Sequence, residues 1–567
     1  MQVTVIFTEA RSFTLELVDA GIYETEKEYE VFVNGKSAGC YQKVVQTIGG
    51  LKPDSEYRIR VHMGEETKEV LVKTLKESYT LNVRDFGALG DGVRDDTTSI
   101  QAAIYACPKD GRVLVPKGVY KVTSLFMKSD VRFEIAEGAV ISGITDREKF
   151  PIFPGMIESY DETSEYNLGT WEGNPLDMFT AIITCVNVSN VMIYGKGTID
   201  GCASRENWWN NPKIRRGAWR PRQIFMNHCE NMVIQGICVK NSPSWNIHPY
   251  FSNHLKFIDL QILNPKDSPN TDGLDPESCE DVEIVGVYFS LGDDCIAIKS
   301  GKIYMGSKYK VPSKNLMIRQ CCMKDGHGSI TIGSEMAAGV LNLTVRDCLF
   351  LHTDRGLRIK TRRGRGEDAI IHDVVFENIK MDHVMTPFVI NSFYFCDPDG
   401  KTEYVRTKDT LPIDKRTPNI KQLAFRNITC ENCHVAAAFL YGLPERKIEK
   451  VEMKNISVRY ADQPTADVPA MMEGVTAYTK HGIYANNIKT LVIENVSVEG
   501  CEGEFSYFTF ISDFVIFQVV KWMFLIFHDF QFSCHIPRPT VDISKFSTFF
   551  SFPRHISRPK VCISHFP

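Results

Sequence analysis

The sequence predicts an all-β protein, a right-handed parallel β-helix preceded by a small N-terminal β-sandwich. Three observations predict this fold class. A strand-and-turn pattern recurs along most of the chain, few helical stretches separate its copies, and 567 residues are too many for one compact core. The composition, with 43% hydrophobic and 24% charged residues, is that of an ordinary globular protein.

The recurring pattern fills residues 76–503, the predicted β-helix domain. Each copy has a polar residue, alternating apolar positions and an Asn- or Gly-rich turn, as in NVMIYGKGTID and TLVIENVSVEG. Equivalent apolar positions lie about 23 to about 49 residues apart, which is typical of a solenoid with loops inserted on one face. Short strands rich in Val and Ile favour a parallel β-helix over leucine-rich or helical repeats. The equivalent positions are Ile193, Ile234, Phe257, Ile284, Ile318, Val345, Phe376, Phe425, Met453 and Ile493.

Residues 1–75 form a separate small module, in which short alternating stretches are divided by turn signals, as in a β-sandwich. Leu51, Pro53 and Tyr57 resemble the tyrosine corner of fibronectin type III domains. Such a module either binds a partner or serves as a spacer or a brace on the catalytic domain, and we favour a spacer or brace over binding.

One helix is predicted at the start of the repeat, in DDTTSIQAAIYACP. Acids and Thr begin it, Ile100 and Ile104 share a face, and Pro108 ends it. A helix there would cover the open edge of the first coil. The preceding NVRDFGALGDG resembles the entry of the pectin-lyase-like β-helix superfamily.

Residues 504–567 form an atypical tail that we expect to lie outside the β-helix. Its Phe-rich run is interrupted by Asp513 and Lys521, which leaves too short an apolar stretch for a good transmembrane helix. HIPRPTVDISKF (535–546) recurs as HISRPKVCISHF (555–566), without the strand period of the preceding repeats. We expect a reading-frame change or a fused foreign segment, with a membrane anchor as the alternative.

Charge and cysteine usage exclude several classes of protein. A formal charge of −5 argues against bulk attraction to nucleic acid, and we expect neither a nucleic-acid nor a membrane partner. The 17 cysteines are scattered without recurring C-x-x-C pairs, which predicts free buried thiols and no zinc site.

The start MQVTVIFTEARSFTLELVD lacks the basic and apolar regions of a signal peptide. The expected location is therefore cytoplasmic, or secreted or periplasmic if the true N-terminus is missing.

Four polar clusters follow four successive repeats, each about 8 to 15 residues after an equivalent apolar position. They are Asn270-Thr271-Asp272, Asp293-Asp294, Gly326-His327-Gly328 and Arg358-Ile359-Lys360. Adjacent coils of a β-helix stack about 4.8 Å apart, so the same lateral position recurs on each coil. We therefore expect Asp272, Asp293, Asp294, His327, Arg358 and Lys360 to converge on one patch of one face.

This set of side chains suits the hydrolysis of an anionic glycoside. One carboxylic acid protonates the leaving oxygen, while another carboxylate activates water. Crowded carboxylates raise the pKa of at least one of them, because they cannot all ionise cheaply. Arg and Lys can bind a substrate carboxylate through charge-assisted hydrogen bonds. Each tripeptide alone is usually structural, but all four in register favour function, and no metal or cofactor is needed.

The segments NTDGLDPESCEDVEI, GDDCIAIKSG, GHGSITIGSE and RGLRIKTRRGRG resemble the four signature segments of glycoside hydrolase family 28, the polygalacturonases. The resemblance covers most of residues 80–500 and implies that 76–503 is the catalytic domain of an inverting enzyme acting on pectic polysaccharide or oligogalacturonides. It implies that Asp293 is the general acid and that Asp272 and Asp294 hold and activate water, with His327 supporting the acid. Arg358, Lys360 and Asn270 would bind galacturonate. Inversion predicts carboxyl separations of about 6.5 to 9.5 Å.

Long insertions precede these segments, at 155–175 and 202–223. Trp208, Trp209 and Trp219 are expected either to block one end of the groove or to stack on sugar, in preference to core packing. A blocked groove predicts an exo-acting enzyme, and a fibronectin-like front module resembles bacterial exo-polygalacturonases. An endo-acting or rhamnogalacturonan-type hydrolase is the alternative.

Two further readings of the same fold stay open. One is a Ca²⁺-dependent polysaccharide lyase, whose elimination product would absorb in the ultraviolet. The other is a non-catalytic carbohydrate-binding or adhesin-like β-helix. The basic stretch Arg362, Arg363 and Arg365 does not discriminate a lyase from a hydrolase, because we expect it to form a solvated rim.

Overall fold

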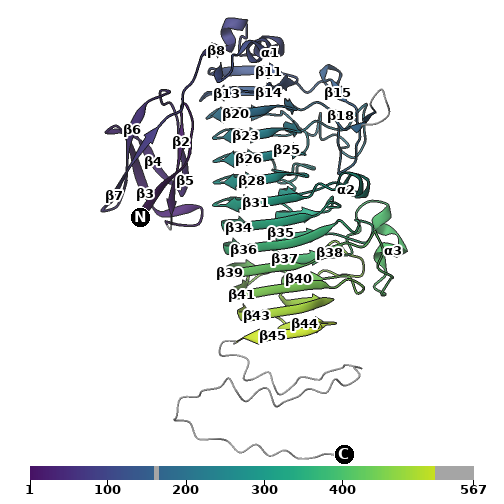
Figure 1. Cartoon of the computed structure of the whole chain (residues 1–567). Helices are drawn as coiled ribbons and strands as arrows, with labels where there is room; N and C mark the ends of the chain where they lie inside the picture. Colours follow the sequence, from purple (N-terminus) through teal and green to yellow (C-terminus); the bar gives the residue numbers. More distant parts are fainter. Residues whose placement is uncertain (19, 159–164, 518–567) are drawn as a thin grey trace, which may run out of the picture. The chain divides into compact units, whose positions relative to one another are not determined.

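The computed structural model describes residues 1–18, 20–158 and 165–517 (Figure 1). Residues 1–517 belong to one compact unit, which ends at Val520. The two tandem copies at 535–546 and 555–566 lie outside the described residues. In the described part of the chain, no helix is long and apolar enough to cross a membrane.

The N-terminal module consists of two small antiparallel sheets, which confirms the predicted β-sandwich. Their inner faces share a core that includes Phe13, Tyr29 and Val61. The Tyr57 hydroxyl accepts a hydrogen bond of 2.8 Å from the backbone amide of Lys52, which is the geometry of a tyrosine corner. The fibronectin type III assignment stays a prediction. The strands are β1 (Gln2–Thr8), β2 (Phe13–Val18) and β5 (Val45–Ile48) in one sheet, with β3 (Glu24–Val33), β4 (Lys36–Lys43), β6 (Glu56–Met63) and β7 (Glu66–Lys73) in the other.

The rest of the unit is a parallel β-helix, as predicted, with strands stacked coil on coil (Figure 1). Its largest sheet has 23 strands. The ten predicted apolar positions are direct register partners from each coil to the next, and all are buried in one core. They lie on β20 (Ser189–Gly195), β23 (Glu230–Gln235), β26 (Asn253–Ile258), β28 (Glu280–Val285), β31 (Ser313–Arg319), β34 (Val340–Leu351), β36 (Ile370–Asp382), β39 (Gln422–Cys433), β41 (Ile448–Tyr460) and β43 (Ile488–Glu499).

A second run of parallel strands forms the face that carries the polar clusters. Four strands are joined to seven more through isolated bridges at Leu274 and Glu277. The first four are β12 (Leu125–Phe126), β19 (Ile183–Val186), β22 (Ile224–Asn227) and β25 (Ile247–Tyr250). The seven are β30 (Asp294–Ile298), β33 (Gly328–Gly333), β35 (Arg355–Lys360), β37 (Thr386–Asn391), β40 (Ala436–Tyr441), β42 (His481–Asn486) and β44 (Ser506–Thr509). We call these eleven strands and the bridged segment the site sheet.

Asn residues stack from coil to coil along the large sheet, as at Asn315 on β31 and Asn342 on β34. Asn315 and Asn342 both have positive φ, of 56° and 54°, a conformation that Asn adopts more readily than most residues. The Asn342 amide donates a 2.9 Å hydrogen bond to the Asn315 side-chain oxygen on the preceding coil. These ladders give the coils a repeated spacing at their corners.

The predicted helix at the start of the repeat is confirmed as α1 (Thr97–Ala106). Ile100 and Ile104 are fully buried on it, and it lies at the end of the β-helix beside β8 (Thr80–Asn82) and β11 (Gly118–Val122) (Figure 1). Two short helices, α2 (Ile303–Tyr309) and α3 (Glu403–Arg406), lie in loops beside the site sheet.

The coils continue beyond the predicted boundary at residue 503. β44 pairs in parallel with β42, and β45 (Asp513–Phe517) pairs in parallel with β43. The first part of the predicted tail therefore belongs to the β-helix, because its backbone still completes one coil.

The module and the β-helix meet at the large sheet and away from the site sheet. The Gln235 side chain bonds Ser12 and Thr14, both at 2.8 Å, and Arg319 pairs with Glu16 at 2.6 Å. Gln235 and Arg319 end strands β23 and β31 of the 23-stranded sheet. This attachment fits a brace, although the role of the module stays a prediction.

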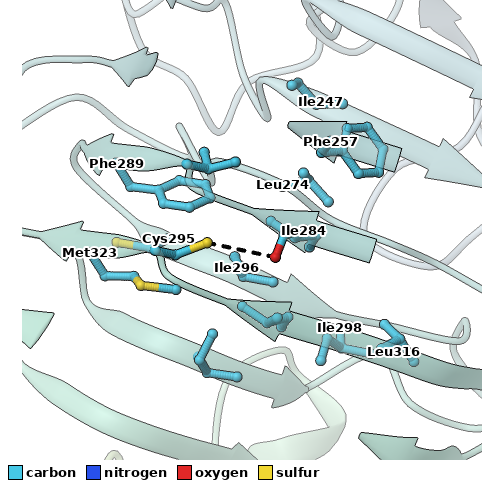
Figure 2. Close-up of a cluster of buried hydrophobic side chains, with 14 of the residues drawn as sticks. Ile247, Phe257, Leu274, Ile284, Phe289, Cys295, Ile296, Ile298, Leu316 and Met323 are labelled. Carbon is cyan, nitrogen blue, oxygen red and sulfur yellow. Dashed lines mark hydrogen bonds between the residues drawn. The ribbon is translucent and has the colours of Figure 1, made fainter. Parts of the chain in front are cut away.

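The core under the site consists of inward-facing side chains from successive coils. Figure 2 shows Leu274, Phe289 and Ile296 among them, and all three are fully buried. Leu274 and Ile296 are bridge partners, so the polar residues just before them share one lateral position. Cys295 is also buried there as a free thiol, in line with the predicted use of cysteine.

Replacing Phe289 with Ala should lower the free energy of unfolding by about 3–5 kcal/mol, because it leaves a cavity in a close-packed interior. Phe289 is fully buried, and an added Cβ on Gly273 would lie 2.6 Å from its ring. Denaturant unfolding followed by circular dichroism measures the loss. The matched control is Leu71→Ala, where the side chain is 78% exposed and a change within about 0.5 kcal/mol is expected. Equal losses in both variants would contradict this account of the core.

Candidate active site

Strand register brings the four polar clusters to one patch on the outward face of the site sheet. Leu274 bridges Ile296, which places Asp272 and Asp294 at equivalent positions two residues earlier. Asp294 in turn is the register partner of Gly328 on β33. On the next coil, β35 pairs with β33 and presents Arg358 and Lys360, which are the register partners of Thr331 and Gly333.

The three aspartates form a tight cluster. One carboxylate oxygen from each of Asp272, Asp293 and Asp294 lies within 4.8 Å of the others. These oxygen–oxygen distances are shorter than the separation of about 6.5 to 9.5 Å expected between the carboxyl groups. The reason is the stacking distance itself, since Asp272 and Asp294 occupy neighbouring coils and Asp293 precedes Asp294 in the chain.

Each carboxylate has its own cationic partner. Nδ1 of His327 lies 3.3 Å from Asp293. Asp294 pairs with Lys360 at 2.7 Å and with Arg358 at 3.2 Å. Asp272 lies 3.7 Å from Nζ of Lys299. Buried carboxylates need such partners because desolvation of an unpaired charge is very costly.

Exposure separates the three carboxylates. The Asp293 side chain is 20% exposed, against 5% for Asp272 and 1% for Asp294. His327 is 54% exposed beside Asp293. Asp293 is therefore the carboxylate that best reaches a molecule lying on the sheet.

The pKa values of the three aspartates in this cluster are shifted in different directions. Burial, then the charge of Asp293, raises the pKa of Asp272 to about 8. Burial alone would raise the pKa of Asp293 and of Asp294 as well. For Asp293, the hydrogen bond with His327 and the charges of His327 and Lys360 together outweigh burial and lower the pKa, while Lys360 and Arg358 hold the pKa of Asp294 well below its usual range. At neutral pH the cluster as a whole thus retains one proton.

Glycines let these side chains approach closely. A Cβ on Gly326 would lie 2.6 Å from the backbone oxygen of Asp293 and 2.9 Å from the Cys295 sulfur. A Cβ on Gly328 would lie 2.9 Å from an Asp294 carboxylate oxygen. The backbone around His327 can therefore sit against the aspartate coil only because both neighbours lack a side chain.

Asn270 links the cluster to an insertion. It adopts a positive φ of 55°, and its side-chain oxygen accepts a 2.7 Å hydrogen bond from Arg220. Arg220 comes from the 202–223 insertion and is buried. Asn270 therefore helps to hold this loop at the site, a structural contact that the sequence did not predict.

The expectation for the insertion tryptophans is wrong for two of the three. Trp208 and Trp209 are buried in a small core with Phe150 and Phe179, because the insertion folds back on itself. Trp219 is partly exposed and stacks on a buried Trp171 with ring centroids 4.6 Å apart.

The basic stretch after β35 is buried and does not form the expected solvated rim. Arg362, Arg363 and Arg365 are each at most 3% exposed. Arg362 pairs with Asp399 at 2.8 Å, and Arg363 pairs with Glu445 at 2.6 Å. Acidic groups from later loops, distant in sequence, make this burial possible.

Sequence reasoning missed Lys299, Glu335 and Trp245. Lys299 and Glu335 form a buried ion pair of 3.4 Å, and Lys299 lies 3.8 Å from the centroid of the Trp245 ring. Lys299 and Glu335 both stand inside quoted segments, GDDCIAIKSG and GHGSITIGSE. Continuing the coil register past the aspartates would have found Lys299.

The aspartate cluster is also the one group of at least three acidic, His or Cys side chains in the described ranges with the spacing of a metal site. Four cationic or protonatable partners already surround it, namely His327, Lys299, Arg358 and Lys360. Added positive charge would be repelled there. The donor set therefore does not favour a cation.

Comparison with known proteins gives a consistent picture. A family model described as "Glycosyl hydrolases family 28" matches residues 111–477, and one described as "Rhamnogalacturonase A/epimerase, pectate lyase-like" matches residues 80–136. A probable polygalacturonase of Vitis vinifera is 28% identical over 440 residues, 74% of this chain and 84% of that protein. An endo-polygalacturonase of Pectobacterium parmentieri is 29% identical over 377 residues, 64% of this chain and 84% of that protein. A family 28 exopolygalacturonase structure from Yersinia enterocolitica shares the fold, with a TM-score of 0.67 at 19% identity over 91% of this chain and 98% of that one.

Replacing Gly326 with Ala should lower the pKa of His327 toward its ordinary value. The added Cβ displaces the Asp293 backbone, and the hydrogen bond with Asp293 is the main cause that raises the pKa of His327. NMR titration of labelled histidines measures the shift. Gly49→Ala is the control, because Gly49 has no atom within 4 Å of a Cβ and no positive φ. An unchanged His327 titration in Gly326→Ala would contradict the described packing.

Proposed function

The chain belongs to glycosyl hydrolase family 28, and from this premise we propose that it hydrolyses α-1,4-galacturonosidic bonds of polygalacturonate or oligogalacturonides. The observation that carries the proposal is the cluster of Asp272, Asp293 and Asp294 with separate cationic partners on one face of the site sheet. Relatives named polygalacturonase, one endo-acting and one exo-acting by name, support the substrate class.

We assign the proton donor to Asp293. It is the most exposed of the three carboxylates. His327 lies beside it and can stabilise the negative charge that forms on Asp293 as the proton leaves. The proton retained by the cluster favours Asp272 in the free protein, so substrate binding must move it to Asp293. A substrate oxygen that approaches Asp293 can accept a hydrogen bond from the protonated Asp293 carboxyl. This hydrogen bond would favour the transfer of the proton to Asp293.

Asp272 and Asp294 hold and activate the attacking water in this proposal. Both are nearly buried, so a water between them has few competing contacts with solvent. Attack on the side opposite the leaving oxygen would invert the anomeric carbon. The short spacing of the oxygens does not itself argue for inversion, and the family resemblance supports it.

Arg358 and Lys360 provide the positive charge for the sugar carboxylate. They extend from β35 next to the aspartates, and each side chain is 11% exposed. A planar guanidinium can bind a carboxylate through two parallel hydrogen bonds, while the ammonium acts as a compact charge. Both groups also compensate Asp294, so substrate recognition and catalysis share the same cations.

We propose exo action as the finer specificity. Trp219 stacked on Trp171, together with Arg220 bonded to Asn270, builds a wall of insertion residues directly beside the aspartate coil. A wall there would admit only the end of a chain. The Yersinia enterocolitica protein of the same fold is an exopolygalacturonase by name, whereas the Pectobacterium parmentieri relative is an endo-polygalacturonase.

The test compares wild type with Asp293→Asn on polygalacturonate. The wild type should release reducing ends with little fall in viscosity, because terminal cleavage hardly shortens the polymer. Asp293→Asn should lower kcat by about 10²–10⁴-fold through loss of the proton donor. A rapid viscosity fall at few cleaved bonds would mean endo action, and an ultraviolet-absorbing unsaturated product would contradict hydrolysis altogether.

Activity should fall as the pH rises through about 8. The cluster must hold one proton to protonate the leaving oxygen, and the raised pKa of Asp272 keeps that proton bound below about pH 8. The pH profile of kcat/KM in the free enzyme measures this basic limb. A profile that stays flat up to pH 10 would show that the retained proton is not used.

A further inference from the structure

Lys299 occupies the site sheet at the same lateral position as Lys360. On the preceding coil, Glu277 is the bridge partner of Lys299. On the coils that follow, Gly333 is the register partner of Lys360. Gly333 has no side chain, and a Cβ there would lie 2.3 Å from the backbone oxygen of Lys360 and 3.2 Å from the Met336 side chain. Lys360 points to Asp294, whereas Lys299 lies beside Asp272.

Lys299 is fixed in place on three sides. Its side chain is 5% exposed, its ammonium lies 3.4 Å from Glu335 and 3.7 Å from Asp272, and the Trp245 ring covers it at 3.8 Å. Trp245 itself is 3% exposed and receives Arg222 at 4.1 Å from its centroid. A cation held this way has little freedom to move toward a substrate.

Among the ion pairs of the described residues, the one that Asp272 forms is with Lys299. Asp293 and Asp294 pair instead with His327, Arg358 and Lys360. Without Lys299, Asp272 would be a nearly buried carboxylate next to two others, and its neutral form, which is already favoured in the free protein, would be favoured more strongly still. Lys299 therefore acts on the distribution of charge inside the cluster.

We propose that Lys299 is a positioning residue that holds Asp272 ionised during the reaction, so that the shared proton is available on Asp293. The inference rests on the proposed hydrolytic function. A proton on Asp272 is unproductive in that scheme, because Asp272 must then act on water. Lys299 favours the productive arrangement by attraction alone and touches neither the sugar nor the water.

The surroundings keep Lys299 charged. Burial acts to lower its pKa, but the acidic groups around it outweigh burial and hold the pKa well above its ordinary value. The ion pair with Glu335 prevents Lys299 from moving fully onto Asp272, which would leave Asp272 too weak a base. The charged or titratable groups facing Lys299 are Asp272, Asp275, Glu277, Asp294, Glu335, Glu172, Arg222 and His248.

The test is Lys299→Met, with Lys299→Arg as rescue and Lys256→Met as control. Lys256 pairs with Glu283 at 3.0 Å on the large sheet, away from the site. In Lys299→Met, kcat on polygalacturonate should fall by about 10- to 100-fold with KM within about threefold, as expected for loss of an interaction used in the transition state. The basic limb of kcat/KM should move to higher pH, because loss of a positive charge makes the cluster hold its proton more tightly. Lys299→Arg should return the limb to its wild-type position.

Two outcomes would overturn the proposal. A rise in KM with kcat and the basic limb unchanged would make Lys299 a substrate-binding residue, and wild-type behaviour of Lys299→Met would remove any role. If Lys299→Met does not fold, Glu335→Gln replaces it as the test variant. Glu335→Gln should move the basic limb of kcat/KM to lower pH, because it removes a negative charge that competes for Lys299. An unmoved basic limb contradicts the proposal. Carboxyl ¹³C NMR titration of labelled aspartates, assigned with Asp272→Asn, gives the same shift without substrate. A protein that hydrolyses no galacturonan but shows this titration shift would refute the proposed function alone.

Discussion

The in-register stacking of coils is the constraint on which the rest of the structure depends. Ile284, Ile318 and Val345 pair directly from coil to coil inside the core, and any slip of one residue would turn them outward. Because inward positions are held by burial, outward positions are held too. Asp272 and Asp294 lie side by side for the same reason that Leu274 and Ile296 do.

Stacking carboxylates this closely creates an electrostatic problem, and the same register solves it. The coil after Asp294 contributes His327, and the next contributes Arg358 and Lys360. The Asp294 coil itself carries Lys299. Positive charge is thus distributed so that each carboxylate meets a different partner. The result is a cluster with one retained proton, which is the state that acid–base chemistry requires.

The insertions shape the approach to this cluster. Trp171 and Trp219 come from different insertions and stack on each other, while Arg220 reaches back to Asn270. Buried arginines such as Arg362 and Arg363 anchor later loops through Asp399 and Glu445. The β-helix therefore places the carboxylates and their cationic partners, and the loops anchored on it lie beside them.

The sequence by itself determined the coil register and the members of the aspartate cluster. Its apolar positions recur with a strand period, and one coil register buries all of these side chains together. The positions from Ile193 through Ile493, and the clusters that follow them, could therefore be aligned directly. The tertiary structure alone decided the burial of Trp208 and Arg362, the pairing of Lys299 with Asp272, and the coil that continues past residue 503. The physical reason is that insertion loops have no period. Their burial and their charges depend on side chains distant in sequence, whose positions are set only when the coils have stacked.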